Sequence, residues 1–563
     1  MNPSSLANGS QCTLPPPNEL LLIWARMKPN EVYLRQIIDD KFKDFTYMEV
    51  AEQALRLVSA LTDLGAKPRD KIALISKNCA EWFICDLAMM LGDFISVPLF
   101  PTAQASTIEY CLTHSDCHFL IAGKLDDNTE ITQVMADMST LTTIALPYSS
   151  APVCQYQFVE LIAKSPPSKH RPQHQDDTIM SIVYTSGTSG TPKGSILTYG
   201  SFAWTSKQII DHIGINSQDR LFSYLPLAHI TERVYIFGSS IMVGIPTAFP
   251  ESLDTFIDNV KMHRPTLFIS VPRLWHLFQQ RILDKIPNHI LQFLLSFFLT
   301  KRLIRRKIIR GLGLEDARVL GCGSAPVSPS LLHWYNRLGL EITEAWGMTE
   351  SLGYGTLNYP FIESKIGTVG RAGPGVELHI AEDGEVMMKT QGMFAGYYHQ
   401  QSNEPCFDEQ GWLHTGDIGS IDEQGYLTLL GRKKDTFKTA KGKFVAPVPI
   451  EKLLYAKSRV EMLCLIGSGH PSPILLVVPH PFPHFDKSRY ERRTKLIIEE
   501  VNQTLEPHAK VKRVLMVANP WSIENGFLTP TLKIKRFELE KHYQNLSENW
   551  PEEQLIRWES DEQ

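Results

Sequence analysis

The sequence predicts an α/β protein with a large N-terminal domain of mixed or parallel sheets and a small α+β C-terminal domain. Its 563 residues are too many for one hydrophobic core. Between Phe45 and Gly123, helical and strand patterns alternate, as in α/β folds with mainly parallel sheets. Past Gly370 the pattern changes to short antiparallel strands. We place the domains at residues 1–431 and 432–563.

Composition and charge narrow the class of protein. Hydrophobic residues make up 43% of the chain and charged residues 21%, as in ordinary globular proteins. The net charge is −5, without the excess of basic residues that is typical of nucleic-acid-binding proteins. We therefore expect no nucleic acid partner. Nine scattered cysteines without a C-x-x-C pair indicate neither a zinc site nor a disulfide framework. Residues 1–17 show no signal-peptide pattern, and we expect a cytoplasmic protein.

Individual elements follow from apolar spacing and turn residues. A helical period from Val50 to Leu64 ends at Gly65, which suits a helix C-cap. A polar, proline-rich connector spans 165–176. The same patterns predict strands over 71–75, 95–100, 118–121, 179–183, 265–272, 385–389, 426–430, 462–466 and 474–478, and helices over 82–92, over 201–212 and near Glu451.

The segment YTSGTSGTPKG at 184–194 has a composition that suits phosphate binding. Its glycines bring backbone N–H groups against an anion, its hydroxyls add donors, and Lys193 adds a positive charge. It is not a Walker loop, because Pro192 precedes Lys193 and Gly194 follows it. The alternative is a solvated Gly/Ser/Thr loop. Two later segments, GCGSAP at 321–326 and WGMTE at 346–350, are placed at strand ends, which line the ligand crevice in doubly wound sheets.

Five segments in this order resemble the adenylate-forming superfamily of acyl-CoA synthetases, adenylation domains and firefly-type luciferases. The resemblance runs from about Phe45 to Arg536. The segments are YTSGTSGTPKG at 184–194 (phosphate loop), EAWGMTE at 344–350 (adenine motif), GWLHTGDIG at 411–419 (ribose motif), GRKKDTFKTAKG at 431–442 (hinge) and NGFLTPTLKIKR at 525–536 (catalytic lysine).

Three further segments look like the long-chain fatty acyl-CoA ligase branch: LPLAHITER at 225–233, VPRLW at 271–275 and TPTLKIKR at 529–536. That resemblance implies an ATP- and Mg²⁺-dependent enzyme that converts a fatty acid to acyl-AMP and then transfers the acyl group to CoA. One rival is a fatty acyl-AMP ligase that loads a carrier protein. Another is a non-catalytic acyl- or nucleotide-binding relative. A homodimer is a further expectation.

By resemblance, the phosphate loop and the adenine motif supply the groups around the phosphates. A carboxylate attacking the α-phosphate brings two anions together, so positive charge must be supplied. Glu350 and Thr185 would hold magnesium, which prefers oxygen ligands, and Thr349 would lie near the α-phosphate. Glu350 could instead cap a helix. The β,γ-phosphate ligands would be Thr185, Ser186, Gly187, Thr188, Ser189, Gly190 and Lys193.

The nucleoside contacts are assigned in the same way. Trp346 stands where the superfamily usually has a tyrosine stacked on adenine, and a core tryptophan is the alternative. Asp417 would grip both ribose hydroxyls, although an Asp after a glycine is often only a turn residue. Arg432 would also reach the ribose. The adenine motif adds Glu344, Ala345 and Gly347, and the opposite wall would be Gly323, Ser324, Ala325 and Pro326.

Lys533 matches the lysine that bridges the substrate carboxylate and the α-phosphate, and a solvated basic patch is the alternative. The resemblance implies that the small domain rotates about a hinge at Lys434, which removes Lys533 and admits CoA. His229 matches a histidine near the acyl carboxylate, with a structural role equally open. Trp275 matches a tryptophan that gates the fatty-acid tunnel in some long-chain members, with core packing as its rival.

Residues 290–312 carry the most apolar run of the chain, too short to span a bilayer, followed by a basic helix. Basic residues from Lys301 to Arg310 lie opposite Ile304, Ile308 and Leu312. Such a helix suits the surface of an anionic membrane. The alternative is a helix packed near the acyl tunnel with a solvated basic face.

Overall fold

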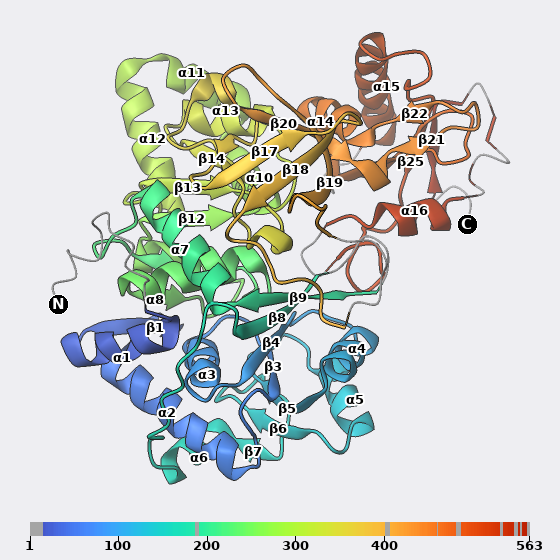
Figure 1. Cartoon of the computed structure of the whole chain (residues 1–563). Coiled ribbons are helices and arrows are strands. Elements are labelled where there is room, and N and C mark those ends of the chain that lie inside the picture. The colour runs from blue at the N-terminus through green and yellow to red at the C-terminus, as the bar shows by residue number, and fades with distance from the viewer. Residues whose placement is uncertain are drawn as a thin grey trace.

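The computed structural model describes residues 15–185, 191–399, 406–458, 460–479, 486–529, 533–544, 546, 550–551 and 554–559. The fold is α/β, as predicted, with the strands of the large domain divided among several sheets. Figure 1 shows the small C-terminal domain, orange to red, beside the sheet that contains β17 to β20.

A seven-stranded sheet forms the lower part of the molecule in Figure 1, in the order β7-β6-β5-β3-β4-β8-β9. Its strands are parallel except β9, which pairs antiparallel with β8. The predicted strands at 71–75, 95–100, 118–121 and 179–183 are all present, whereas β9 was not predicted. The bounds are β3 Lys71–Ile75, β4 Ile95–Leu99, β5 Cys117–Ala122, β6 Thr142–Ala145, β7 Tyr156–Gln157, β8 Ile179–Thr185 and β9 Lys193–Thr198.

A nine-stranded sheet has the order β16-β15-β14-β13-β12-β10-β11-β1-β2. Its six central strands are parallel, from β14 to β1, and the edge strands are antiparallel. The carboxyl ends of β10, β12, β13 and β14 therefore meet at one edge. The bounds are β1 Val32–Ile38, β2 Lys41–Thr46, β10 Leu221–Phe222, β11 Thr247–Phe249, β12 Leu267–Ser270, β13 Val319–Cys322, β14 Ile342–Trp346, β15 Thr356–Leu357 and β16 Arg371–Ala372.

Helices cover and separate these sheets. Thr46 caps α2 through a capping box with Glu49, and the helix ends before Gly65, whose φ of 100° needs a glycine. Helix α3 is buried along its whole length because it contacts β4 of one sheet and β1 of the other. The bounds are α1 Pro17–Met27, α2 Tyr47–Asp63, α3 Ala80–Leu91, α4 Ala105–Ser115, α5 Thr129–Asp137, α6 Phe158–Lys164, α7 Tyr199–Ile213, α8 Ser239–Val243, α9 Phe256–His263, α10 Pro272–Lys285 and α13 Pro329–Arg337.

A four-stranded antiparallel sheet joins the large domain to the small one. It consists of β17 Val376–Ile380, β18 Glu385–Thr390, β19 Leu413–Ile421 and β20 Leu427–Arg432. The small domain packs helices against a second four-stranded sheet around two apolar clusters. Its elements are β21 Phe437–Lys438, β22 Phe444–Val445, α14 Pro447–Lys457, β23 Val460–Ile466, β24 Ile474–Pro479, α15 Lys487–Gln503, β25 Arg513–Met516, α16 Arg536–His542 and β26 Ile556–Trp558.

The segment 290–312 departs from its prediction. It forms two helices, α11 Asn288–Ser296 and α12 Phe298–Leu312, with a break at Phe297. Ile308 and Leu312, which the sequence placed on an apolar face suited either to a membrane or to packing, are buried in the core of the large domain. The helical period that aligned these residues therefore marks a face packed on the protein, as in the stated alternative of a packed helix with a solvated basic face. Within the described residues, no helix has the length and apolarity to cross a membrane.

Candidate active site

Three parallel strands of the nine-stranded sheet, β10, β13 and β14, deliver candidate residues to one edge, because these residues lie at or after the carboxyl ends of the strands. The segment after β10 carries His229, and Gly323 and Ser324 come directly after β13. Trp346 is the last residue of β14. Thr349 and Glu350 follow in a single 3-10 turn. The structure thus brings together residues that are more than a hundred positions apart in the sequence.

The predicted phosphate loop joins β8 to β9. Thr185 ends β8, Lys193 begins β9, and the two residues are cross-strand partners. The Thr185 hydroxyl donates to the Lys193 carbonyl oxygen at 3.4 Å. The predicted ligands Ser186, Gly187, Thr188, Ser189 and Gly190 lie outside the described residues.

Glu350 is buried and held by the segment 394–398. Its carboxylate accepts a short hydrogen bond from the Tyr397 hydroxyl, and its carbonyl oxygen accepts the Phe394 N–H at 2.9 Å. Lys193 Nζ lies 5.0 Å from the centroid of the Tyr397 ring. This segment also pairs with β9 through Ser195 and Tyr397. A carboxylate suited to magnesium is thereby fixed beside the base of the predicted phosphate loop.

The wall opposite the adenine motif contains a strained position. Ser324 has a φ of 67°, in the left-handed region that non-glycine residues seldom adopt. Its hydroxyl lies 3.4 Å from the Thr231 hydroxyl. Gly323 is close to β14, since an added Cβ would lie 3.3 Å from the Ala345 carbonyl oxygen. Ala325 and Pro326 follow with exposed side chains.

Trp346 and Asp417 are in direct contact. The indole N–H of Trp346 donates to Asp417 Oδ2 at 2.8 Å, and Arg432 Nε lies 3.3 Å from Oδ1. Asp417 and Arg432 are cross-strand partners in β19 and β20. The predicted adenine and ribose residues therefore form one connected group, and their nucleotide contacts stay predictions.

The other residues of the adenine motif have mainly packing contacts. Glu344 Oε2 accepts the Gly367 N–H at 2.8 Å. Burial raises the pKa of Glu344 to about 7, against the opposing effects of that hydrogen bond and of Lys452 in the small domain. Gly347 has no room for a side chain, because a Cβ would lie 2.4 Å from the Gly353 carbonyl oxygen. Ala345 is half-buried on the face of β14 opposite to Glu344.

Lys533 of the small domain is placed among these residues. A pair of backbone and hydroxyl hydrogen bonds with Thr529 fixes its main chain. Burial lowers the pKa of Lys533 to about 8; the charge of Arg432 lowers it further, while Asp417 and Glu350 oppose the shift. The small domain thus delivers a lysine to the carboxylates of the large domain, as the resemblance implies for adenylation.

His229 is kept neutral. Burial, assisted by the charge of Lys533, lowers its pKa to about 3. The Thr231 N–H donates to His229 Nδ1 at 3.3 Å, which leaves the proton on Nε2. A neutral imidazole that carries its proton on Nε2 can donate to a substrate carboxylate. Trp275, in contrast, is fully buried and donates to the Gly321 carbonyl oxygen at 3.2 Å, the geometry of a packed core residue.

Family models match both parts of the chain. The AMP-binding enzyme model matches residues 22–398, and the AMP-binding enzyme C-terminal domain model matches residues 434–550. The chain belongs to the AMP-binding enzyme family. The superfamily predicted from the sequence is confirmed.

Curated relatives of this AMP-binding enzyme cover nearly its full length. Long-chain-fatty-acid–CoA ligase FadD15 of Mycobacterium bovis is 26% identical, over 91% of this chain and 93% of that protein. Long-chain-fatty-acid–CoA ligase 5 of Rattus norvegicus is 29% identical, over 92% and 84%.

Solved structures share the fold. The anthranilate CoA ligase AuaEII in complex with anthranoyl-AMP superposes with a TM-score of 0.77 at 19% identity, covering 97% of this chain and all of that one. o-Succinylbenzoate CoA synthetase from Bacillus subtilis, in complex with ATP and magnesium, gives a TM-score of 0.72 at 20% identity, covering 92% and 99%. At these identities the likeness establishes the fold of this AMP-binding enzyme.

Sequence reasoning missed two residues of the site in this AMP-binding enzyme. Tyr397 was not singled out, although it follows a glycine in a run of aromatics. Glu232 lies inside the quoted segment 225–233 but was given no role. It begins the π-helix Glu232–Gly238, and its carboxylate accepts the Tyr224 N–H at 3.0 Å. Burial raises the pKa of Glu232 to about 8, and the hydrogen bonds from Ser223 and Tyr224 oppose this. A buried acid next to the His229 loop was the available signal.

Proposed function

We propose that this enzyme activates a long-chain fatty acid with ATP to form acyl-AMP and pyrophosphate, and then transfers the acyl group to CoA. The observation that carries the proposal is that Lys533 of the small domain interacts electrostatically with Glu350 and Asp417 of the large domain and with Arg432 at the boundary between the two. A cation that interacts with these carboxylates suits a reaction that joins a carboxylate to a phosphate, because both reactants are anions.

The residues present also suit magnesium. Glu350 offers a buried carboxylate already oriented by Tyr397, and Thr185 offers a hydroxyl at the base of the loop. Both are oxygen ligands of the kind that magnesium prefers. Bound there, the ion would add positive charge next to the phosphates. Lys193 would hold the pyrophosphate as it leaves.

Two observations favour an acyl chain over a small acid. The named relatives that cover about nine tenths of this chain are long-chain-fatty-acid–CoA ligases. The segment after β10 that carries His229 also carries Tyr224, which stacks on Phe268 next to Phe278 in an apolar cluster. Such a cluster is the surrounding that an alkyl chain would need.

The test is pyrophosphate exchange followed by product analysis. Enzyme, ATP, magnesium and fatty acids of increasing chain length should give exchange that depends on the acid, and added CoA should give acyl-CoA. Acyl-AMP and pyrophosphate without thioester would instead support the carrier-loading ligase. No exchange with any fatty acid would overturn the proposal.

We further propose that the corner between α11 and α12 contacts an anionic membrane, from which the fatty acid would be taken. Apolar side chains at this corner are strongly exposed: Phe298 is 80%, Leu299 75% and Leu303 68% exposed. Phe293 and Phe297 pack edge to face beside them, at 5.0 Å between ring centroids. Exposed patches of this kind mark sites of protein or membrane contact.

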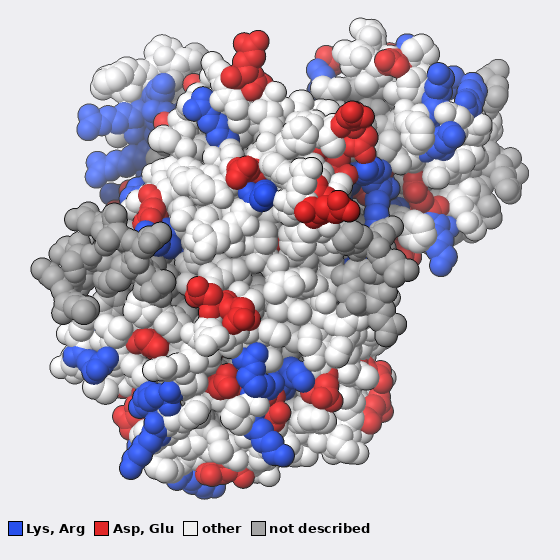
Figure 2. Space-filling model, viewed as in Figure 1, with Lys and Arg blue, Asp and Glu red and all other residues white. Residues whose placement is uncertain are grey.

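The charges around the corner favour lipid. Lys301, Arg302, Arg306, Lys307 and Arg310 lie on α12, and in Figure 2 blue side chains gather at the upper left, where Figure 1 draws this helix. Among the described residues, none of these five has an ion-pair partner within 4 Å. Unpaired cations beside exposed apolar groups complement anionic headgroups and acyl chains together.

Vesicle flotation tests this contact. Wild-type protein should float with vesicles of phosphatidylcholine and phosphatidylglycerol at 3:1, and much less with phosphatidylcholine alone. Phe298→Ser with Leu299→Ser should lower the affinity for these vesicles by about a hundredfold, because each buried apolar side chain contributes on the order of 1.5 kcal/mol or more. The matched control is Leu253→Ser, which also changes a strongly exposed apolar residue. Equal flotation of the corner variant and wild type would overturn the contact.

A further inference from the structure

The hydrogen bond between Trp346 and Asp417 joins two sheets inside the site. Trp346 ends β14 of the nine-stranded sheet, and Asp417 lies in β19 of the four-stranded sheet. Both residues are nearly inaccessible, with 8% and 7% of their surface exposed. The indole nitrogen and Asp417 Oδ2 are 2.8 Å apart, the length of a charge-assisted hydrogen bond.

This bond fixes the rotation of the carboxylate. Each carboxylate oxygen has two acceptor positions, so a donor on Oδ2 still leaves room for further donors. Arg432 lies on the other oxygen at 3.3 Å, and Thr415 Oγ1 accepts the backbone N–H of Asp417 at 3.1 Å. The side chain and main chain of Asp417 are therefore both held before any ligand arrives.

The donor is particular to tryptophan. A phenylalanine ring has no donor, and the hydroxyl of a tyrosine lies at the far end of its ring. Neither can place an N–H where the indole places it. Because Trp346 and Asp417 both precede the hinge expected at Lys434, their bond does not require the small domain to be in place.

We propose that Trp346 is a positioning residue for ribose recognition: its indole N–H orients the Asp417 carboxylate to accept the ribose hydroxyls of ATP. This role is additional to stacking of the ring on adenine, and it rests on the proposed function. It couples the base-binding residue to the sugar-binding residue through one hydrogen bond.

The test compares ATP with 2′-deoxy-ATP and 3′-deoxy-ATP in pyrophosphate exchange. Trp346→Phe should raise the KM for ATP by about tenfold, as expected for loss of a hydrogen bond to a charged group, and change kcat less. For each deoxynucleotide, the substitution should raise KM by less than it does for ATP. One ribose hydroxyl that the oriented Asp417 carboxylate would accept is already missing from these nucleotides. The ratio of KM values for 2′-deoxy-ATP and ATP should therefore fall toward one.

Two controls keep the test specific. Trp334→Phe removes a tryptophan that is equally buried and that donates to Asn288 Oδ1 at 3.3 Å on the helical side of the domain. This substitution should leave the ratio of KM values for 2′-deoxy-ATP and ATP unchanged. If Trp346→Phe does not fold, Trp346→Tyr keeps a large ring but has no N–H at the position of the indole nitrogen, and it should show the same fall in the ratio of KM values for 2′-deoxy-ATP and ATP.

The outcomes separate this inference from the function on which it rests. If Trp346→Phe raised KM by the same factor for ATP and for both deoxynucleotides, Trp346 would have a packing role only, and the inference would be overturned. An unchanged KM for ATP would overturn it as well. If wild-type enzyme shows no ATP binding by calorimetry, the proposed function and the inference both fail.

Discussion

The two ends of the parallel strands β10, β12 and β13 are built on opposite principles. At the amino ends, the charged groups are matched by partners of the same domain. At the carboxyl ends, the charged and titratable groups are drawn from both domains, and two of them, Lys533 and His229, have lowered pKa values. The same three strands supply both sets, since Arg220, Thr266 and Arg318 precede them while the candidate site follows them.

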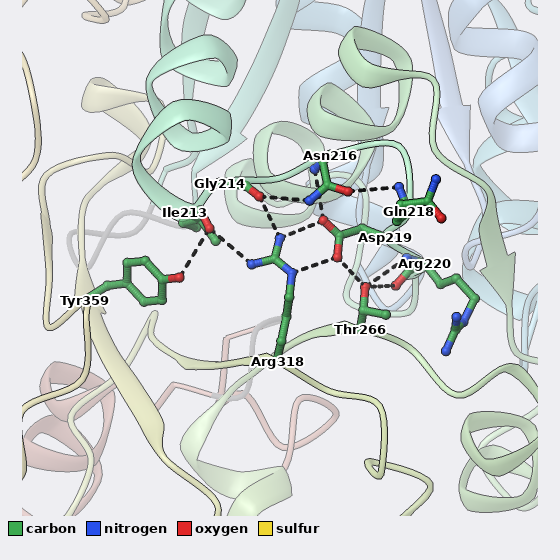
Figure 3. A network of polar contacts seen from close by, with 9 residues as sticks. All are labelled: Ile213, Gly214, Asn216, Gln218, Asp219, Arg220, Thr266, Arg318 and Tyr359. Atoms are coloured by element: carbon green, nitrogen blue, oxygen red, sulfur yellow. Dashed lines mark hydrogen bonds and ion pairs between the residues drawn. The ribbon is translucent and has the colours of Figure 1, made fainter.

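Figure 3 shows the amino-end network, which centres on Asp219. The Asp219 carboxylate accepts from Arg318 Nε at 2.9 Å and Nη2 at 2.6 Å, and from the Thr266 hydroxyl at 2.7 Å. Arg318 also donates to the Ile213 and Gly214 carbonyl oxygens at the end of α7. Burial alone would raise the pKa of Asp219, but these donors bring it below its ordinary value.

At the carboxyl ends, the effect of burial on the pKa values outweighs the effect of partner groups. The pKa of Lys533 is lowered to about 8 and that of His229 to about 3, in each case mainly by burial. No comparable set of partners offsets the shift for either group among the described residues. Strong shifts of this kind are typical of functional sites. The contrast teaches that one end of the sheet supports stability and the other is prepared for charged ligands.

The largest expected effect is at the carboxyl end. Lys533→Ala should lower fatty-acid-dependent pyrophosphate exchange by roughly 100-fold or more, the scale seen when one preorganised charge-stabilising donor is removed. Its melting temperature should stay near that of wild type, because the substitution removes a buried charge held beside Arg432. Lys541→Ala, an exposed lysine of α16, is the control. Undiminished exchange in the Lys533 variant would contradict the assignment of the site.

The amino end should respond in stability and not in activity. Arg318→Met leaves the Asp219 carboxylate buried without its main partner. We expect a loss of about 2 kcal/mol in the free energy of unfolding, less than for a fully buried pair, because the Arg318 side chain is 35% exposed. Urea unfolding measures this. Exchange per folded molecule should not change.

The matched control for that variant is Arg264→Met, whose ion pair with Asp316 is more exposed and should contribute about 1 kcal/mol at most. If both variants lost the same free energy of unfolding, the Asp219 network would stabilise the protein no more than an exposed ion pair does.

The pH dependence of adenylation tests whether the lowered pKa of Lys533 controls the reaction at the carboxyl ends of the strands. Because the pKa of Lys533 is lowered to about 8, its positive charge is lost as the pH rises above that value. The kcat/KM for ATP, which reports the free enzyme, should then fall by about tenfold per pH unit. Lys533→Arg retains its charge at every such pH, and its residual activity should show no fall in this range. A parallel fall in both proteins would assign the titration to another group.

The smallest expected effect lies between the domains. Burial lowers the pKa of Lys452 on α14, and the charge of Glu344 opposes this across the domain boundary. Lys452→Met should weaken the arrangement that places Lys533 in the site, lowering the exchange rate by about threefold, the effect of a few tenths to 1 kcal/mol. Lys457→Met, on the same helix but paired with Glu500 inside the small domain, should have no such effect. Acyl-AMP formation and thioester formation should be measured separately.

The sequence predicted the elements with a regular apolar period. Helix α2 and strand β3 were placed within a few residues, because burial of one face imposes the period directly. Strand β9 was missed, since its first residues belong to a glycine- and hydroxyl-rich segment that suggests only a loop. The break at Phe297 was missed because an apolar run carries no signal for a helix end.

For the site, motifs placed the residues but not their mutual contacts. Asp219 and Arg318 are about a hundred residues apart and lie in no motif, so only the sheet register brings them together. The Trp346–Asp417 bond likewise depends on how two sheets pack. The sequence named both residues and gave each a ligand. It could not indicate that they bind each other.

The hairpin of β8 and β9 has a consequence for how a product leaves. Thr185 and Lys193 face each other at its base, and α7 begins only at Tyr199, after a full strand. The predicted phosphate loop therefore leads into a strand, not into the positive end of a helix dipole. Under the proposed function, the departing pyrophosphate would be retained by the exposed side chain of Lys193. Rotation of one side chain could then release it, with every helix of the domain left in position.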